Sequence, residues 1–273
     1  MASARLLPVP DPLRPSPAAA RALRALSRPY RVPAEPFEVR TRDGLRLRGH
    51  RLGRGRTALV FCHGFLGWHR KPRLVRFQEA LADRFTLYAF DFRGHGWSEG
   101  RSAFGALEHL DVDAVVGRAR ADGFERVVTL GGSMGGIAVV RQAALLGGVD
   151  AVACVSTPAL WDGHDSGPVR TITWLTATPG GRRLLSALGV RVVPTWERVE
   201  APVEVVGRIA PTPLLIVHGR DDRYFDEEQA WMLYRAARPP KRLLLASRFG
   251  HAEDGYTEGF AARVGRLLDG ARG

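Results

Sequence analysis

The chain has 273 residues, a length within the range of one large α/β domain, and its 45% of hydrophobic residues can fill a sizeable core. A net charge of +12 is compatible with nucleic-acid binding, but nearly all the basic residues are arginines and they are scattered along the chain without a basic block. We therefore expect no nucleic-acid partner.

The sequence also lacks the patterns of a disulfide framework or a membrane span. Cys62 and Cys154 lie in apolar runs, where we expect buried, reduced thiols. The longest run without a charged residue covers residues 127–140 and is shorter than the ~20 residues that cross a bilayer. No apolar signal core follows the start of the chain. We therefore expect no membrane span and a cytoplasmic location.

Residues 1–36 form an arm that is rich in proline and arginine, with eight prolines and six arginines. Within this arm, residues 18–28 predict a short helix that is bounded by prolines. We interpret the arm as a partly ordered extension of the domain that follows it.

The regular domain is expected to cover residues 37–273. Residues 37–42 and 45–50 alternate apolar and charged side chains on either side of Asp43-Gly44, which predicts a hairpin with one face in water. After this hairpin, apolar runs alternate with helical patterns. The predicted strands are 58–62, 86–91, 126–130 and 151–156, and the predicted helices are 70–83, 107–122 and 134–146. This alternation predicts an α/β fold, in which a mostly parallel twisted sheet carries helices on both faces.

The alternation stops over residues 157–210, where only two short helical patterns occur, at 169–176 and 182–188. We interpret this stretch as a short helical cap inserted over the edge of the sheet. The alternation then resumes with predicted strands at 213–217 and 242–246 and predicted helices at 227–237 and 256–269.

The turn after the strand at 126–130 carries the pattern Gly131-x-Ser133-x-Gly135. Glycines on both sides allow a turn so sharp that the Ser133 hydroxyl points outward at the carboxyl edge of the sheet. The backbone N–H of Met134 then lies in the first turn of a helix, where it has no partner and can stabilise negative charge. The alternative is a glycine-rich turn with an incidental serine.

Four other predicted strands are followed by polar residues at the same edge of the sheet. These segments are His63-Gly64-Phe65, Asp91-Phe92-Arg93-Gly94-His95-Gly96, His218-Gly219-Arg220-Asp221-Asp222 and Ser247-Arg248-Phe249-Gly250-His251. Together with the serine turn, they resemble the α/β-hydrolase fold superfamily and its serine esterase and lipase-like members, over about residues 37–270.

This resemblance implies a catalytic triad of Ser133 as nucleophile, Asp222 as acid and His251 as base. It also implies that the backbone N–H groups of Phe65 and Met134 form the oxyanion hole. The adjacent carboxylate of Asp221 remains an alternative acid. Three other histidines compete with His251 for the role of base, namely His63, His95 and His218.

The activity that the resemblance implies is hydrolysis of a carboxylic ester or thioester through an acyl-enzyme. The same triad also serves C–C bond cleavage, amide hydrolysis and acyl transfer, and a catalytically silent ligand-binding member is a further alternative. We expect no cofactor. We expect no metal either, because the histidines and cysteines lack the close pairing of a metal site.

The substrate is expected to be a small ester-type molecule. Five of the six tryptophans fall in predicted loops or in the insertion, namely Trp68, Trp97, Trp161, Trp174 and Trp196. If they line the mouth of the site, the acyl or alcohol group is apolar. The alternative is that they pack the insertion onto the domain.

Overall fold

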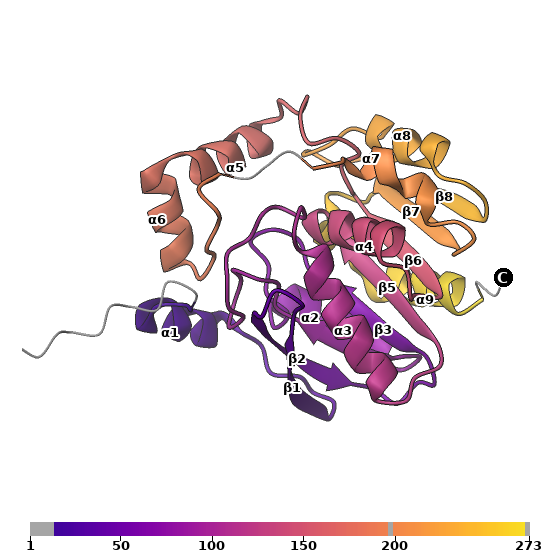
Figure 1. Cartoon of the computed structure of the whole chain (residues 1–273), viewed down its shortest axis with the longest axis horizontal. Helices are drawn as coiled ribbons and strands as arrows, with labels where there is room; N and C mark the ends of the chain where they lie inside the picture. Colours follow the sequence, from indigo (N-terminus) through magenta and orange to yellow (C-terminus); the bar gives the residue numbers. More distant parts are fainter. Residues whose placement is uncertain (1–13, 196–198, 271–273) are drawn as a thin grey trace, which may run out of the picture.

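The computed structural model in Figure 1 describes residues 14–195 and 199–270 and is built on one eight-stranded sheet. In space the strands follow the order β1-β2-β4-β3-β5-β6-β7-β8. Their bounds are β1 Ala34–Arg40, β2 Arg46–Leu52, β3 Ala58–Cys62, β4 Thr86–Phe90, β5 Val127–Gly132, β6 Ala151–Val155, β7 Leu214–Gly219 and β8 Lys241–Ala246. Strands β3 to β8 all run parallel to one another. Strands β1 and β2 form an antiparallel hairpin at the edge, and β2 joins the sheet by antiparallel pairing with β4. The predicted α/β fold class is confirmed.

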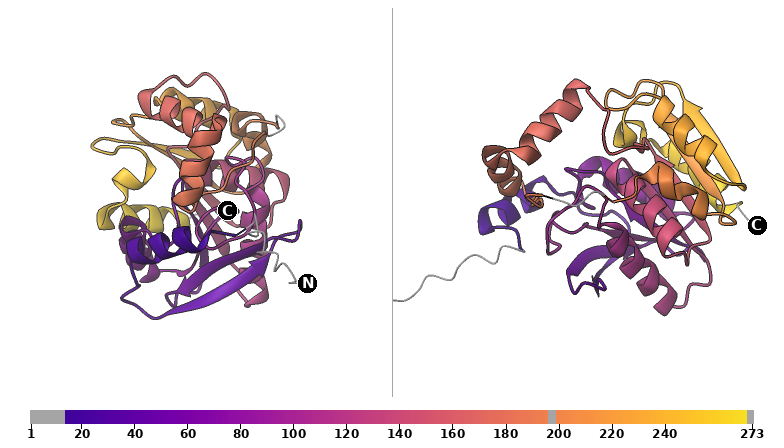
Figure 2. Two further views of the ribbon diagram at one scale, coloured as in Figure 1. Left: turned by 90° about the vertical axis from the view of Figure 1, so that its left-hand side faces the viewer. Right: turned by 45° about the horizontal axis from the view of Figure 1, so that its top comes forward.

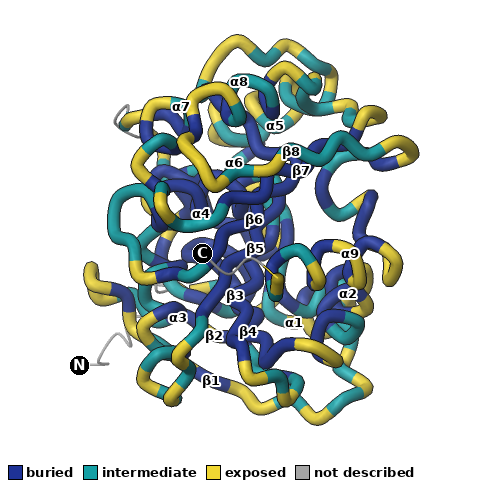
Figure 3. Tube along the Cα trace, turned by 90° about the vertical axis from the view of Figure 1, so that its right-hand side faces the viewer, coloured by how far each residue is buried: buried dark blue, intermediate teal, exposed yellow. Residues whose placement is uncertain are grey.

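Helices cover both faces of this sheet. On one face lie α3 (His109–Ala121), α4 (Met134–Leu145) and α8 (Glu228–Ala236), and on the other lie α2 (Pro72–Ala82) and α9 (Glu258–Asp269). Strand β3 shows how the chain serves both layers, because successive side chains of a strand point to opposite faces. Val60 packs on the first layer, whereas Leu59 and Phe61 pack on the second. Figure 3 shows the result, with the central strands buried throughout their length.

The segment between β6 and β7 departs from this layered pattern. It contains α5 (Gly167–Ala177), α6 (Pro179–Ala187), the short α7 (Pro202–Val205) and a 3-10 turn, η1 (Val206–Arg208). Figures 1 and 2 show α5 and α6 standing away from the sheet at one end of the molecule. Each begins with a hydroxyl cap, since the side chains of Ser166 and Thr178 accept hydrogen bonds from backbone N–H groups of the first turn.

The described part of the N-terminal arm contains a helix, α1 (Pro17–Leu26). An extended segment at residues 27–31, which we call the strap, follows it. Residues 1–13 lie outside the described residues. The backbone N–H of Arg28 donates to the carbonyl oxygen of Arg70 over 2.9 Å. The indole of Trp68 donates to the Ser27 hydroxyl over 2.9 Å. The strap therefore holds the loop between β3 and α2. None of the helices in the described ranges is long and apolar enough to span a bilayer.

The segment after β4 is organised by a buried arginine. Arg93 is 2% exposed, and its Nε and backbone N–H each donate to the carboxylate of Asp111 on α3 over 2.8 Å. Its Nη1 donates to Asp43, in the turn between β1 and β2, over 2.8 Å. One guanidinium thus joins the hairpin, the carboxyl end of β4 and α3. The arginine of the Asp-x-Arg-Gly-His-Gly segment is a structural residue here.

The two carboxylates that hold Arg93 differ in burial, which predicts a difference in stability. Asp111 is fully buried, so Asp111→Asn should lower the free energy of unfolding by about 3 kcal/mol, because the buried guanidinium loses most of its compensation. Asp43 is 41% exposed, so Asp43→Asn should cost under about 1 kcal/mol. Urea unfolding near neutral pH measures both values. Equal losses for the two variants would contradict this assignment.

Candidate active site

Ser133 lies at the turn between β5 and α4, in a backbone conformation that few residues other than glycine adopt. Its φ is 54° and its ψ is −120°. Such strained positions are typical of functional sites, and this one is held by a hydrogen bond from the Ser133 N–H to the Val155 carbonyl oxygen over 2.8 Å. The flanking glycines are required by close packing. A Cβ on Gly131 would lie 2.1 Å from the carbonyl oxygen of Gly135, and one on Gly135 would lie 2.3 Å from that of Cys62.

Asp222 and His251 form a partly buried hydrogen-bonded pair. The distance from Asp222 Oδ2 to His251 Nδ1 is 2.8 Å, and the Asp222 side chain is 1% exposed. Asp222 Oδ1 accepts hydrogen bonds from the backbone N–H groups of Tyr224 over 2.8 Å and Phe225 over 3.2 Å. The neighbouring Asp221 is exposed. Of the two adjacent carboxylates, the one that contacts the histidine is therefore Asp222.

The environment of Asp222 keeps this carboxylate ionised. Burial by itself raises the pKa of Asp222, but hydrogen bonds from His251 and from the backbone N–H groups of Tyr224 and Phe225 outweigh it. The net pKa is below the ordinary value for an aspartate. A carboxylate that stays charged can fix the His251 tautomer with its proton on Nδ1 and stabilise a positive charge on the ring.

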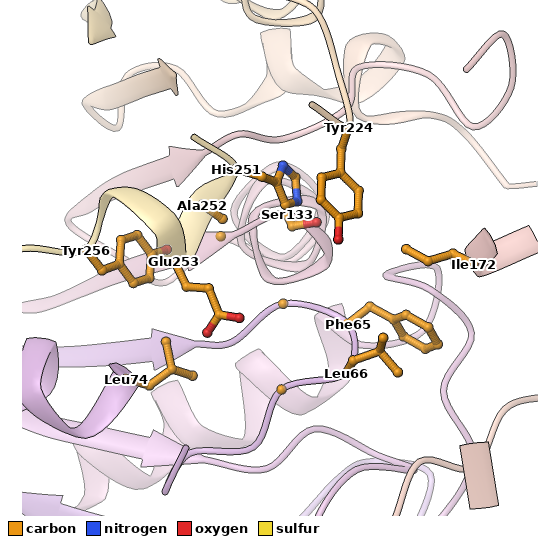
Figure 4. A pocket seen from close by; sticks show the side chains of 13 residues that line it. Phe65, Leu66, Leu74, Ser133, Ile172, Tyr224, His251, Ala252, Glu253 and Tyr256 are labelled. Carbon is orange, nitrogen blue, oxygen red and sulfur yellow. The ribbon is translucent and has the colours of Figure 1, made fainter. Parts of the chain in front are cut away.

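Ser133 and His251 line the same cavity, where Figure 4 shows the imidazole beside the serine side chain. Because Nδ1 of His251 faces Asp222, Nε2 is the ring nitrogen left to act on a proton. The Tyr224 ring stacks on the imidazole, with the ring centroids 4.2 Å apart and the planes at 25°. No sequence pattern points to Tyr224, because this contact forms only when the loops after β7 and β8 meet in space.

The other three candidate histidines are buried in the loops that surround the site. His95 donates from Nδ1 to the Arg93 carbonyl oxygen over 3.1 Å, and His218 donates from Nε2 to the Phe225 carbonyl oxygen over 3.1 Å. His63 contacts Gly64 instead. Within the described residues, the histidine that shares the Ser133 cavity is His251.

His63 fixes the loop that follows β3. Its Nε2 accepts a hydrogen bond from the Phe92 N–H over 3.1 Å, so the ring proton is on Nδ1, which donates to the Gly64 carbonyl oxygen over 2.8 Å. That oxygen also accepts from the Gly67 N–H over 3.0 Å. In a planar trans peptide, the N–H points away from the carbonyl. The N–H of Phe65 therefore points away from His63.

This loop runs beside the serine, since a Cβ on Gly64 would lie 3.4 Å from the Ser133 Cβ. The backbone N–H of Met134 is the first of α4, at a helix end that favours negative charge. Neither the Phe65 N–H nor the Met134 N–H has a backbone or side-chain acceptor in the described ranges. Two free donors thus flank the serine.

The residues that line the cavity do not include the tryptophans that the sequence predicted there. Its lining consists of Gly64, Phe65, Leu66, Gly67, Leu74, Gly132, Ser133, Ile172, Tyr224, His251, Ala252, Glu253 and Tyr256. The apolar surface comes from Phe65, Leu66, Leu74 and Ile172. Glu253 is the carboxylate in the lining, and it forms an ion pair with Lys71.

The prediction for Trp68, Trp97, Trp161 and Trp174 needs correction for this cavity. Trp68 binds Ser27 of the N-terminal strap, and the indole of Trp161 donates to the Val199 carbonyl oxygen over 2.8 Å. Trp97 packs edge-on against His69, and Trp174 is 55% exposed on α5. Trp196 lies outside the described residues. The Trp68 bond holds the N-terminal strap and not the insertion, whereas Trp161 of the insertion also lies 6.0 Å from the guanidinium of Arg141 on α4 and so contacts the domain, as in the alternative.

Cys62 and Cys154 are both free and buried. Burial raises the pKa of each thiol, so neither is poised as a thiolate nucleophile. The described residues include no group of three or more histidine, cysteine, aspartate or glutamate side chains arranged to hold a metal ion.

Residues 57–168 match the family model described as alpha/beta hydrolase fold. The chain has the α/β-hydrolase fold. The resemblance that the sequence motifs carried is thereby confirmed, and the strand–turn–helix around Ser133 lies inside the matched region.

Individual known proteins are also similar to this chain. The uncharacterized protein YfhR of Escherichia coli O157:H7 is 29% identical over 226 residues, which cover 78% of this chain and 71% of YfhR. The serine hydrolase BPHL of Mus musculus is 33% identical over 104 residues, 37% of this chain and 36% of BPHL. The esterase Pf2001 of Pyrococcus furiosus superposes with a TM-score of 0.68 at 20% identity, over 87% of this chain and 92% of Pf2001. Pf2001 therefore shares the fold.

The neutral state of His63 makes the stability of this loop depend on pH. Burial lowers the pKa of His63 from 6.5 to about 4, so the unfolded chain binds a proton more readily than the folded one. The stabilisation is present above pH 6.5 and is lost as the pH falls toward 4. Between about pH 7 and about pH 5, His63 should account for a loss of about 2 kcal/mol in the free energy of unfolding.

The variant His63→Gln separates this contribution from those of other titrating groups. It should lose about 2 kcal/mol less than the unsubstituted protein over the same pH interval, whatever its stability at neutral pH. Urea unfolding at the two pH values measures both losses. Equal pH dependence in the two proteins would show that His63 is protonated or solvated in the folded state.

Proposed function

We propose that this protein is a serine hydrolase that cleaves a carboxylic ester or thioester through an acyl-enzyme. The observation that carries the proposal is the hydrogen bond from His251 to Asp222, because this same His251 lines the cavity that contains Ser133. A strained serine, an oriented imidazole and two free N–H donors are the parts that acyl transfer requires. The fold, which is shared with an esterase, is compatible with this chemistry.

In the proposed mechanism, Nε2 of His251 removes the proton of Ser133 as its oxygen attacks the carbonyl carbon of the substrate. Asp222 keeps the imidazole in the required tautomer and stabilises the imidazolium that forms. The N–H groups of Phe65 and Met134 stabilise the oxyanion of the tetrahedral intermediate. When this intermediate collapses, His251 protonates the departing alcohol or thiol. Water activated by the same imidazole then attacks the acyl-enzyme and releases the acid.

The lining of the cavity supports a small substrate with an apolar acyl or alcohol group. Phe65 and Leu66 come from the loop after β3, Leu74 from α2 and Ile172 from α5, so sheet, helix and cap all contribute apolar surface. Apolar walls with a few polar groups are typical of sites that orient a reacting carbonyl. The specificity is therefore assigned to these four residues and not to the tryptophans.

Ser133→Ala tests the nucleophile. This variant should lose about 10⁶-fold in kcat on a p-nitrophenyl ester or a thioester and should no longer react with a fluorophosphonate probe, while urea unfolding stays unchanged. Ser247→Ala is the matched control, because Ser247 is an exposed serine in the loop that precedes His251. It should keep both activities. A Ser133→Ala protein that still binds the probe would refute the proposal, and so would an unsubstituted protein that hydrolyses neither ester nor thioester.

A pair of adjacent substitutions tests the acid. Asp222→Asn removes the charge that orients His251 and should lower kcat by about 10⁴-fold. Asp221→Asn makes the same chemical change one residue away on an exposed side chain and should leave kcat within about twofold. Steady-state hydrolysis of one ester by both variants gives the comparison. The assignment fails if the two variants lose the same activity or if Asp221→Asn loses more.

A further inference from the structure

Exposed apolar side chains gather at one end of the molecule. The described residues include five exposed large hydrophobic side chains, and four of them lie on or next to α1, α5 and α6. These are Leu26 at 56% exposed, Trp174 at 55%, Leu184 at 49% and Leu188 at 54%. Figures 1 and 2 show the three helices side by side, away from the sheet. We call this end the α1–α5–α6 face.

Helix α5 has an unusual burial pattern for a helix of its composition. Four of its eleven residues are Val169, Ile172, Trp174 and Leu175, yet none of its residues is buried. An amphipathic helix of a globular protein normally buries an apolar stripe against its own core. The apolar surface of α5 is only partly covered by the rest of the chain.

Most of the charges on this face are positive. Residues 14–34, which contain α1, include five arginines and no aspartate or glutamate. Residues 166–195, which contain α5 and α6, include four arginines and no acidic residue, although Arg191 is buried and Arg170 pairs with the exposed Asp165 just before α5. A second copy of the chain would bring like charges together. An anionic surface would instead be attracted.

Helices that lie in the headgroup region of anionic bilayers typically combine arginines with exposed leucines and tryptophans, as this face does. We propose that the α1–α5–α6 face docks on the surface of an anionic phospholipid bilayer. Trp174 and the three leucines enter the boundary between headgroups and acyl chains, and the arginines pair with the phosphates. Ile172 of α5 also lines the Ser133 cavity, so docking places the cavity next to the lipid surface. Binding itself requires no catalysis.

Vesicle co-sedimentation of the full chain tests this inference. Vesicles of phosphatidylcholine with added phosphatidylglycerol should retain the protein at low ionic strength, pure phosphatidylcholine should retain much less, and salt should release it. Arg183 is exposed on α6, and Arg183→Glu should weaken binding roughly 30-fold. Arg238→Glu makes the same change on an exposed arginine after α8, away from this face, and should have a much smaller effect. Trp174→Ser should also reduce the bound fraction.

Unchanged hydrolysis of a water-soluble ester by Arg183→Glu would show that this variant is folded, and circular dichroism gives the same check if no ester is cleaved. The inference is overturned if the protein does not sediment with anionic vesicles. Equal losses for Arg183→Glu and Arg238→Glu would overturn it too, because they would assign binding to overall charge. A protein that binds soluble polyglutamate through Arg183 but does not bind vesicles would also overturn the inference, because this result would indicate an acidic protein partner.

Discussion

The close approach of α4 to β5 and β3 is the constraint on which the site depends. Gly131 and Gly135 leave no room for a side chain between strand and helix, and this contact holds Ser133 at a positive φ. The same contact fixes the N–H of Met134 at the start of α4. The packing of α4 against these strands therefore fixes the positions of both the Ser133 side chain and the Met134 N–H donor. The remaining groups come from loops that the parallel sheet gathers at the same edge.

Buried polar groups hold these loops in place. His63 joins the loop after β3 to the backbone after β4, and Asp222 accepts hydrogen bonds from two backbone N–H groups as well as from His251. Asp91 plays a comparable part, since burial raises its pKa but contacts with His69 lower it to about 2. Each group has at least one hydrogen-bond partner on another loop. The rim of the site is thus a network of mutually dependent loops and not a set of independent turns.

The sequence was sufficient for features that depend on local chemistry. Continuous apolar runs predicted β3 and β4, and glycines on both sides of a serine predicted the turn at Ser133. Helix α2 begins at Pro72 and not at residue 70 because proline favours the first helical position. Helix α7 was not predicted, because four residues are too few to show a period.

Contacts between distant segments could not be predicted in this way. The stacking of Tyr224 on His251, the two partners of Arg93 and the inward position of Leu74 all depend on how loops meet in space. The tryptophans illustrate the same limit. Their occurrence in loops suggested a binding surface, whereas Trp68 and Trp161 turned out to bind other segments of the chain through their indole N–H groups.

The strap at residues 27–31 has a consequence for where a minimal fragment can begin. Sequence patterning places the start of regular structure near residue 37, and a truncation there would look harmless. Such a fragment would lose the hydroxyl acceptor of the Trp68 indole, the N–H donor to the Arg70 carbonyl oxygen and the Tyr30 hydroxyl that binds Gln78 over 2.7 Å. Trp68 and Arg70 lie in the loop that carries Phe65, and Gln78 lies on α2, the helix that follows this loop. The shortest fragment that keeps these contacts therefore includes the strap.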